Sequence, residues 1–454
     1  MISGRDDERA NRYDQVMRFC GPMKTTQLRV SAAGNAAFYV LAVLVLGHNT
    51  GAAAETTVPA SDLQDEASRI HEFVTFNPNY LQERTPRIAR ARSLGKVVRE
   101  REAAGRPTLA CNQILNEVSW LIDSTADFKR IDQRLNDLDD TLAHPEREAD
   151  AAKQDPRDGS WARYTTEWFL KVDLSFDHLI DKQVPGQDIV APLMLDRINS
   201  PQKLSDYFMS VAVSDITHQG VDHRRELNES LANLSRLIFK DKPGGYHYHP
   251  ALKQSMRDLI LAKLRNPATG CWGEQYVRDG NVQFVDDLSV TFHMVSYMHG
   301  EVPDLPKILD FVLAARDLEY PVGWLKDGKF TNHNNMDVVT LFQYGWPQAN
   351  TQQRRAIAAE LQKMLDWCLQ KSLQPDGAFK PTTESLEEEQ YFGVSFLSRC
   401  GYFDKSNRFW TDQTFPESET VRQRLIAEIK SRMARGRSGF GWYEDALQAL
   451  QPSQ

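Results

Sequence analysis

The residues best suited to chemistry lie in one short stretch, TNHNNMDVVTLFQY. It holds an imidazole (His333), two amides (Asn334 and Asn335), a carboxylate (Asp337) and a phenol (Tyr344). A His or Tyr with a pKa near neutral can accept or donate a proton, and amide donors can stabilise a developing negative charge. The structural alternative is a helix entry, in which Asn335 caps the helix and Asp337 favours its positive first turn.

A second set of polar and aromatic residues lies at other junctions between a turn and a helix. Glycosidases need two carboxylates that face a sugar across about 5 to 10 Å, and aromatic rings can stack on sugar faces. We therefore expect substrate-binding residues in this set, and the candidates are Trp272, Glu274, Tyr276, Asp286, Asp287, His293, Glu389 and Tyr391. Two structural alternatives stay open: the aromatics can be core wedges, and Asp287 can cap the next helix.

Histidines form a metal site only where the fold gathers them. His247 and His249 project to the same side of an extended segment, and a ring of helices could bring His293, His333 and Asp337 to them. The chain has no H-E-x-x-H and no C-x-x-C motif, which are spacings typical of zinc sites. We therefore expect no metal ion and no other cofactor.

The elements that position these residues are mainly helices. Apolar residues recur at helical spacing in 303–320 and 354–373. The segments 285–298, 336–346 and 387–400 are more apolar and follow turns directly. Each stretch between two turns therefore predicts an inner helix directly after the first turn and a more charged outer helix before the next turn.

Glycine-containing turns beside an aromatic residue recur along the chain. They are DGSWARY at 158, TGCWGEQY at 269, VGWLKDGKF at 322, PDGAFK at 375 and SGFGWYED at 438, and from 269 the spacings are 53, 53 and 63 residues. Self-similarity at a nearly fixed period is the signature of a repeat architecture. Within these turns, Asp279-Gly280 and Asp327-Gly328 predict short hairpins, since Asp-Gly suits a positive-φ turn.

With their paired helices, these turns resemble the α/α toroid shared by squalene-cyclase-like terpenoid cyclases, protein prenyltransferase β-subunits and several polysaccharide lyases and glycosidases. The resemblance covers roughly residues 110 to 450. It implies an all-α fold, an (α/α)6-7 toroid of antiparallel helix pairs with short glycine/aromatic turns. In such a toroid the junctions before the inner helices surround a funnel, so their side chains are the first candidates for a site.

The run from DGKF through His333 to Tyr344-Gly345 resembles the DGSF, His and Tyr-Gly pattern of toroid lyases that cleave uronate-containing polysaccharides. Those enzymes act by β-elimination. The resemblance implies that His333 is the base or a partner of the uronate carboxylate and that Tyr344 is base and acid. Asn334 or Asn335 would donate hydrogen bonds to the carboxylate.

The function we expect is therefore that of an exported lyase acting on a uronate-containing glycan, with an acidic or neutral polysaccharide as partner. The alternatives are a non-catalytic toroid that binds a glycan or a protein, a glycoside hydrolase, and a terpenoid cyclase. The last rests on Asp286-Asp287, which resembles part of the D-x-D-D motif of those cyclases.

The N-terminal residues predict a secretory signal. A basic start (Met23, Lys24, Arg29), the apolar run 36–46 and an A-x-A pattern before Glu55 fit such a signal. Because spanning a bilayer takes about 20 apolar residues, we expect no membrane span after cleavage. The predicted organisation is an N-terminal extension with signal peptide (1–54, Met23 being an alternative start), a helical extension (55–109) and the toroid (110–454), in a secreted or periplasmic protein.

The net charge of −8 argues against nucleic acid as a partner, because phosphate binding needs a basic face. One basic run, 84–106, can be a solvated helical surface or a contact for a polyanion. The predicted mature chain has four cysteines, and Cys368 with Cys400 is our first choice for a disulfide.

Overall fold

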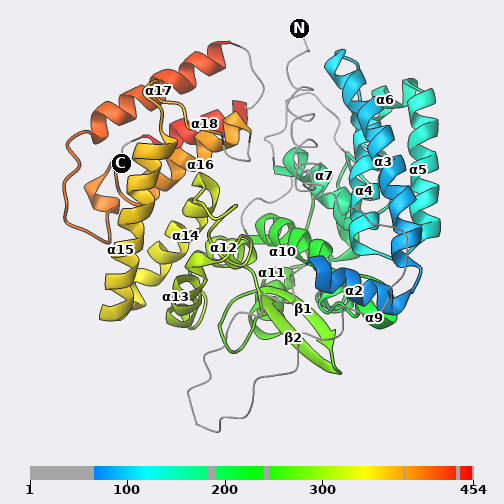
Figure 1. Cartoon of the computed structure of the whole chain (residues 1–454), viewed down its shortest axis with the longest axis horizontal. Helices are drawn as coiled ribbons and strands as arrows, with labels where there is room; N and C mark the ends of the chain where they lie inside the picture. The colour runs from blue at the N-terminus through cyan, green and yellow to red at the C-terminus, as the bar shows by residue number, and fades with distance from the viewer. Residues whose placement is uncertain (1–65, 181–189, 240–244, 382–384, 436–439, 452–454) are drawn as a thin grey trace, which may run out of the picture.

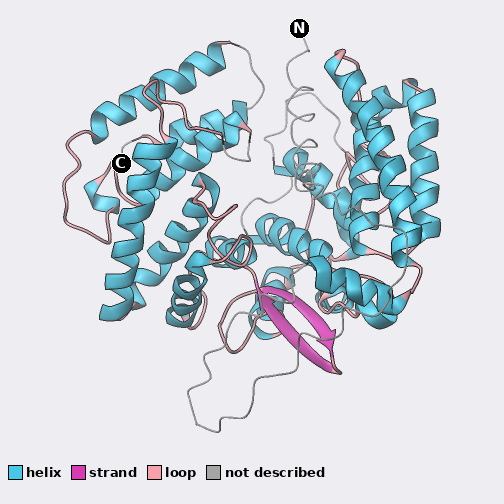
Figure 2. Cartoon of the chain, viewed as in Figure 1, coloured by secondary structure: helices cyan, strands magenta, loops and turns pink. Residues whose placement is uncertain are grey.

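The computed structural model describes residues 66–180, 190–239, 245–381, 385–435 and 440–451, so the predicted signal peptide and its cleavage site lie outside the described residues. Within these ranges the chain is almost entirely helical, and its two described strands form one antiparallel hairpin, β1 (Gly273–Arg278) with β2 (Asn281–Asp286) (Figure 2). The helices are α2 (Glu66–Phe76), α3 (Tyr80–Ala103), α4 (Leu109–Ser124), α5 (Phe128–Ala143), α6 (Glu146–Ala151), α7 (Trp168–Ile180), α8 (Pro201–Val211), α9 (Ile216–Gln219), α10 (Arg224–Phe239), α11 (Leu252–Ala262), α12 (Leu288–Tyr297), α13 (Leu305–Ala314), α14 (Asn332–Gly345), α15 (Thr351–Trp367), α16 (Leu386–Arg399), α17 (Ser418–Ala434) and α18 (Phe440–Ala449). The predicted all-α class is confirmed.

Alternate helices pack side by side in chain order. Helix α7 contacts α10, which contacts α12, and the series continues through α14 and α16 to α18. The intervening helices form a second layer, in which α8 packs against α11 and α13 against α15. Figure 1 shows the whole as an arc, with α3 to α6 at one end and α15 to α18 at the other. No extensive contact between α18 and α2 to α7 joins the two ends within the described residues.

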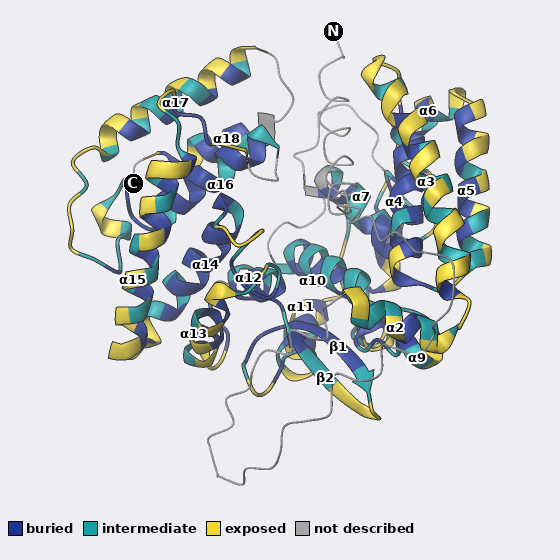
Figure 3. Cartoon of the chain, viewed as in Figure 1, coloured by how far each residue is buried: buried dark blue, intermediate teal, exposed yellow. Residues whose placement is uncertain are grey.

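Burial separates the two layers as the hydrophobic pattern predicts. In α14, 11 of 14 residues are buried. In α15, 5 of 17 are buried, and they include the stripe Ile357, Leu361 and Leu365. Figure 3 shows the same contrast along the arc, with exposed residues concentrated on α3, α5, α15 and α17. A helix buried on most sides belongs to an inner layer, and a helix with one buried stripe covers it.

Short polar side chains fix where the inner helices begin. Asp287 accepts a hydrogen bond from the Val290 N–H at 2.9 Å, so the alternative that gave Asp287 an N-cap role is confirmed. Thr331, rather than Asn335, caps α14, because its hydroxyl oxygen accepts from the Asn334 N–H at 3.1 Å. The prediction of an Asn335 cap is therefore wrong, since the helix begins one turn earlier.

The two Asp-Gly hairpins are confirmed. Asp279 and Gly280 have φ of 52° and 73° between β1 and β2, and Asp327 and Gly328 have φ of 51° and 68°. Two successive positive φ values are the requirement of the tight turn that Asp-Gly favours.

Most of the basic run 84–106 lies on α3, and several of its cations pair with carboxylates of the same or a neighbouring helix. Arg87 contacts Asp132 of α5 at 2.5 Å and Glu83 at 2.7 Å, and Arg90 pairs with Asp139 of α5. These pairs favour the helical-surface interpretation, because paired guanidinium groups are less available to a polyanion.

The predicted disulfide is absent. Cys111, Cys271, Cys368 and Cys400 are all free and buried. Cys368 instead donates to the amide oxygen of Asn332 at 3.6 Å. The described helices include none that is both long and apolar enough to cross a membrane.

Candidate functional site

The first turn of α14 places His333 beside a buried carboxylate. Asp337 is fully buried, and its Oδ2 lies 3.9 Å from the His333 Nε2 and accepts from the Tyr320 hydroxyl at 3.5 Å. The imidazole stacks on Phe392 of α16, with centroids 4.1 Å apart and an interplanar angle of 7°. Two of the five residues predicted to be catalytic, His333 and Asp337, are therefore together, and the Asp337 carboxylate is buried rather than exposed to solvent.

Aromatic rings from several elements lie next to His333 and to one another. The Tyr320 ring lies 5.7 Å from the imidazole, and Phe392 lies 5.2 Å from Tyr391. Trp442 of α18 is 4.9 Å from Tyr391 and 5.9 Å from Phe392. All but Phe392 are only partly buried. We call Tyr320, His333, Tyr391, Phe392 and Trp442 the aromatic wall.

A guanidinium and a second imidazole lie next to the aromatic wall. Burial, with smaller contributions from His333 and Arg236, lowers the pKa of His293 on α12 to about 4, so this ring is neutral at pH 7. Burial raises the pKa of Tyr391, and Arg236 is among the cations that oppose the shift, so the phenol keeps its proton. Arg236 of α10 therefore lies close enough to influence both groups, and its guanidinium also stacks over Phe176 at 5.2 Å.

Tyr344 is not part of this group. It follows His333 by eleven residues on α14, which is a rise of about 16 Å along the helix. Its ring lies against Gly300, where an added Cβ would come 2.5 Å from Cδ1. The predicted pairing of His333 with Tyr344 is therefore corrected: the helix holds the two at opposite ends, so they cannot act on one carbon atom.

The two amides predicted to bind a carboxylate are buried in the helix packing. The Asn334 Nδ2 donates to the backbone carbonyl of Trp324 at 2.8 Å. Asn335 is fully buried, and neither of its amide atoms has a hydrogen-bond partner among the residues that the structure describes. Neither amide faces solvent, so the structure assigns Asn334 a role in packing and gives Asn335 no contact with a substrate.

The residues around the β1–β2 hairpin are also core residues. The Trp272 Nε1 donates to the Ile260 carbonyl at 2.9 Å and the side chain is fully buried. Glu274 accepts from the Tyr276 hydroxyl at 2.9 Å and pairs with Arg224 at 3.3 Å. Their predicted role in sugar binding is corrected, because a buried ring cannot stack on a ligand.

The remaining predicted carboxylates are likewise turned inward. Asp286 accepts from the Asn266 amide at 2.9 Å, and Asp287 caps α12. Burial, strengthened by Glu274, raises the pKa of Asp287 to about 8. Glu389 accepts from the Asn332 amide at 3.0 Å and is 1% exposed. Of the predicted binding residues, only His293 and Tyr391 lie at the aromatic wall.

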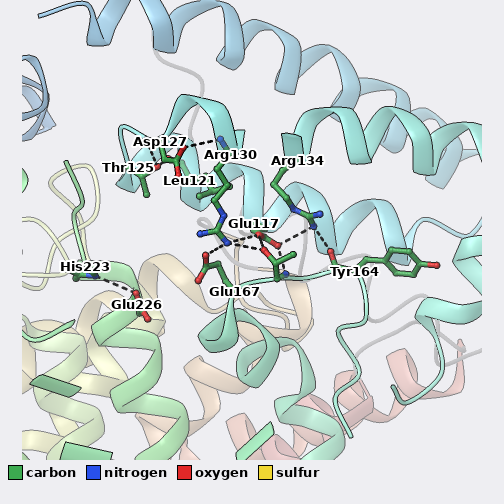
Figure 4. Close-up of polar contacts among 11 residues, drawn as sticks. Glu117, Leu121, Thr125, Asp127, Arg130, Arg134, Tyr164, Glu167, His223 and Glu226 are labelled. Carbon is green, nitrogen blue, oxygen red and sulfur yellow. Dashed lines mark hydrogen bonds and ion pairs between the residues drawn. The ribbon is translucent and has the colours of Figure 1, made fainter. Parts of the chain in front are cut away.

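Sequence reasoning missed a buried ionic cluster between α4, α5 and α7. Figure 4 shows the Glu117 carboxylate between Arg130 and Arg134, at 3.4 and 3.2 Å. It also accepts from the Thr166 N–H at 2.8 Å, and Arg130 reaches on to Glu167. The i, i+4 spacing of the two arginines was a usable signal, but only the fold shows that Glu117 faces them.

A second missed group joins α4, α7 and α10. The Arg225 guanidinium donates to the Asn116 Oδ1 at 2.7 Å and to Glu229 at 2.6 Å. The Asn233 amide donates to Asp173 of α7 at 3.1 Å. Burial, opposed by Arg225, raises the pKa of Glu229 to about 7. Arg225, Glu229, Asn233 and Arg236 form one polar stripe on the helix 224–239, and the sequence displays it at spacings of 4, 4 and 3.

The residues considered for a metal site are not gathered into one group, although His333 and Asp337 lie together. His247 and His249 are exposed in the turn before α11. No group of three or more His, Cys, Asp or Glu side chains in the described ranges is arranged to hold a metal ion. In comparisons with known proteins, no family model matches this chain, and neither a curated protein nor a solved structure is significantly similar to it.

Proposed function

We propose that the inner side of the arc binds a uronate-containing polysaccharide and cleaves it by β-elimination at His293, Tyr391 and Arg236. The observation that carries the proposal is that the helices α10, α12, α14 and α16 pack side by side in this order and carry Arg236, His293, His333 and Tyr391. In agreement with this packing, Arg236 is among the charges that shift the pKa of His293 and of Tyr391. A guanidinium, an imidazole and a phenol are the three kinds of group that the reaction needs. The rows of alternate helices support the toroid as part of the proposal.

The reaction assigns one step to each group. Arg236 pairs with the uronate carboxylate and stabilises the charge that develops when the C5 proton leaves. His293, neutral at pH 7, accepts that proton, and the electron pair of the C5–H bond forms the C4=C5 double bond. The C4–O bond breaks, and Tyr391 donates its phenolic proton to the departing oxygen. Exchange with water then returns a proton to Tyr391 and removes one from His293.

The aromatic wall serves binding in this proposal. Flat rings such as those of Trp442 and Tyr391 offer apolar faces for sugar rings. His333, which lies 3.9 Å from Asp337 and stacks on Phe392, keeps its predicted role as a partner of the substrate carboxylate in this proposal. A secreted or periplasmic location belongs to the same proposal and rests on the N-terminal sequence.

The test is an activity screen against uronate-containing and neutral polysaccharides, with the ultraviolet absorbance of an unsaturated uronate as readout. We expect cleavage of at least one acidic polysaccharide, and its loss in His293→Ala, Tyr391→Phe and Arg236→Ala. Arg257→Ala is the matched control, since this arginine of α11 pairs at 3.1 Å with Glu301, a 70% exposed carboxylate between α12 and α13. Binding without any absorbance change would contradict cleavage and favour a non-catalytic binder.

A further inference from the structure

The basic run on α3 places its cations on two sides of the helix. Arg87 and Arg90 lie on the side next to α5 and pair with carboxylates of that helix. Arg92, Lys96 and Arg99 follow one another at spacings of four and three residues, so they share one flank. Nine residues, or about two and a half turns, separate Arg90 from Arg99, which puts this flank on the side away from α5. We call Arg92, Lys96 and Arg99 the cationic flank.

The fold makes little use of the charges on the cationic flank. All three side chains are exposed. Arg92 and Arg99 have no carboxylate within ion-pair distance in the part of the chain that the structure describes. Lys96 has only an i, i+4 contact with Glu100 at 3.8 Å, in which the two side chains are 73% and 64% exposed. An ion pair this exposed is weak, so the three charges are available to a partner.

The geometry of the cationic flank fits an extended polyanion. From Arg92 to Arg99 the rise along α3 is about 10 Å, so the three charges follow a line close to the helix axis. A guanidinium can bind a carboxylate through two parallel hydrogen bonds. A polymer whose carboxylates recur along its length can therefore pair with these cations one after another.

Two other anionic partners fit this surface less well. A helix that lies on a lipid surface needs a continuous apolar face, but the exposed apolar residues of α3, Leu81 and Val97, lie on different sides of the helix. Single-stranded nucleic acid is bound by aromatic rings that stack on bases, and Tyr80, the one aromatic residue of α3, is buried. The observations therefore favour an acidic polysaccharide.

We propose that the cationic flank is a second, non-catalytic binding surface for the acidic polysaccharide, an inference that rests on the proposed function. Figure 1 shows α3 at the end of the arc opposite to α16 and α18, which carry Tyr391 and Trp442 of the aromatic wall. A polymer held at α3 reaches the aromatic wall at a high effective concentration, whereas an oligosaccharide too short to contact both does not. The protein therefore prefers long chains.

The test combines Arg92→Gln, Lys96→Gln and Arg99→Gln in one variant of the full chain. The matched control combines Lys253→Gln, Lys263→Gln and Lys307→Gln, which removes three exposed cations on or next to α11 and α13 and gives the same net charge. We expect the flank variant to raise KM for a uronate polymer about tenfold with kcat unchanged, and to leave cleavage of a uronate tetrasaccharide unchanged. The control should alter neither. Added salt should reduce the difference, because exposed charges are screened.

A flank variant that raises the polymer KM no more than the control, or that impairs the tetrasaccharide equally, would overturn the second surface while the lyase proposal stands. Calorimetry with the same polymer separates the opposite case. Binding that only the flank variant weakens, in a protein that cleaves nothing, would support the surface and contradict the lyase. A wild type that does not bind the polymer would overturn both, and flank-dependent binding of phosphatidylglycerol vesicles or single-stranded DNA in such a protein would assign the flank to that partner instead.

Discussion

Removal of the Glu117 carboxylate tests whether the ionic cluster of Figure 4 holds α4 to α5 and to the segment before α7. Glu117 is 0% exposed, and Glu117→Ala leaves the Arg134 guanidinium, itself 8% exposed, without this partner at 3.2 Å. It also leaves the Thr166 N–H without its acceptor. Breaking a buried pair by removing one partner costs about 3 to 5 kcal/mol. Glu117→Gln keeps an oxygen for the Thr166 N–H and loses only the charge, so we expect it to lower the free energy of unfolding by about 1 to 3 kcal/mol.

The matched control is Glu83→Ala, because Glu83 pairs with Arg87 within α3 and its side chain is 46% exposed. An exposed i, i+4 pair contributes about 0.3 to 0.5 kcal/mol. Urea unfolding gives the global effect, and hydrogen exchange at the Thr166 amide gives the local effect without a two-state assumption. The cluster does not stabilise this end of the arc if Glu117→Ala lowers the free energy of unfolding no more than Glu83→Ala does, or if the hydrogen-exchange rate of the Thr166 amide is unchanged.

Three further changes test the assignment of predicted site residues to the core. Asp287→Asn keeps the N-cap but cannot lose a proton. Because folding raises the pKa of Asp287 to about 8, deprotonation opposes folding, and we expect the wild type to lose stability between about pH 4 and pH 8 while the variant does not. The variant should then be more stable at pH 9 by about 1 to 3 kcal/mol, and the same pH dependence of the melting temperature in both proteins would refute this. Trp272→Phe should lower the unfolding free energy by about 1 to 3 kcal/mol, because it removes the bond to the Ile260 carbonyl, without changing the affinity for glycans; a selective loss of binding would restore its predicted role in sugar stacking. Gly300→Ala should lower the melting temperature, because Gly300 has a φ of 73° and its Cβ would meet Tyr344, and unchanged melting would mean that this ring moves freely.

Local signals in the sequence predict the order of elements well. The Asp287 cap, the Asp-Gly turns and the alternation of apolar and charged helices are all present, because each depends on residues within about one turn of the helix or strand. The Asn335 cap failed for a local reason too, since Thr331 competes for the same role four residues earlier.

The sequence could not predict whether a side chain at a junction between a turn and a helix faces solvent or the core, because this depends on partners far along the chain. Glu274 is buried by Arg224, which lies fifty residues before it, and Glu389 by Asn332, fifty-seven residues before it. Both carboxylates stand at polar junctions that would line a funnel if those partners were elsewhere. A sequence pattern assigns a residue to a junction, whereas only the packing decides whether it faces solvent or a neighbouring helix.

Helix α10 carries Arg236, on which the lyase proposal depends, and its two faces explain why it can position charged groups. Its apolar and small residues Leu227, Ser230, Leu231, Leu234, Ser235, Leu237 and Ile238 are buried against neighbouring helices. The other face carries the charged stripe from Arg225 to Arg236. Because the buried face fixes the rotation of the helix, the spacing of Arg225, Glu229 and Arg236 is set before a ligand arrives. The packing of α10 therefore decides where Arg236 lies relative to the neighbouring helices α7 and α12.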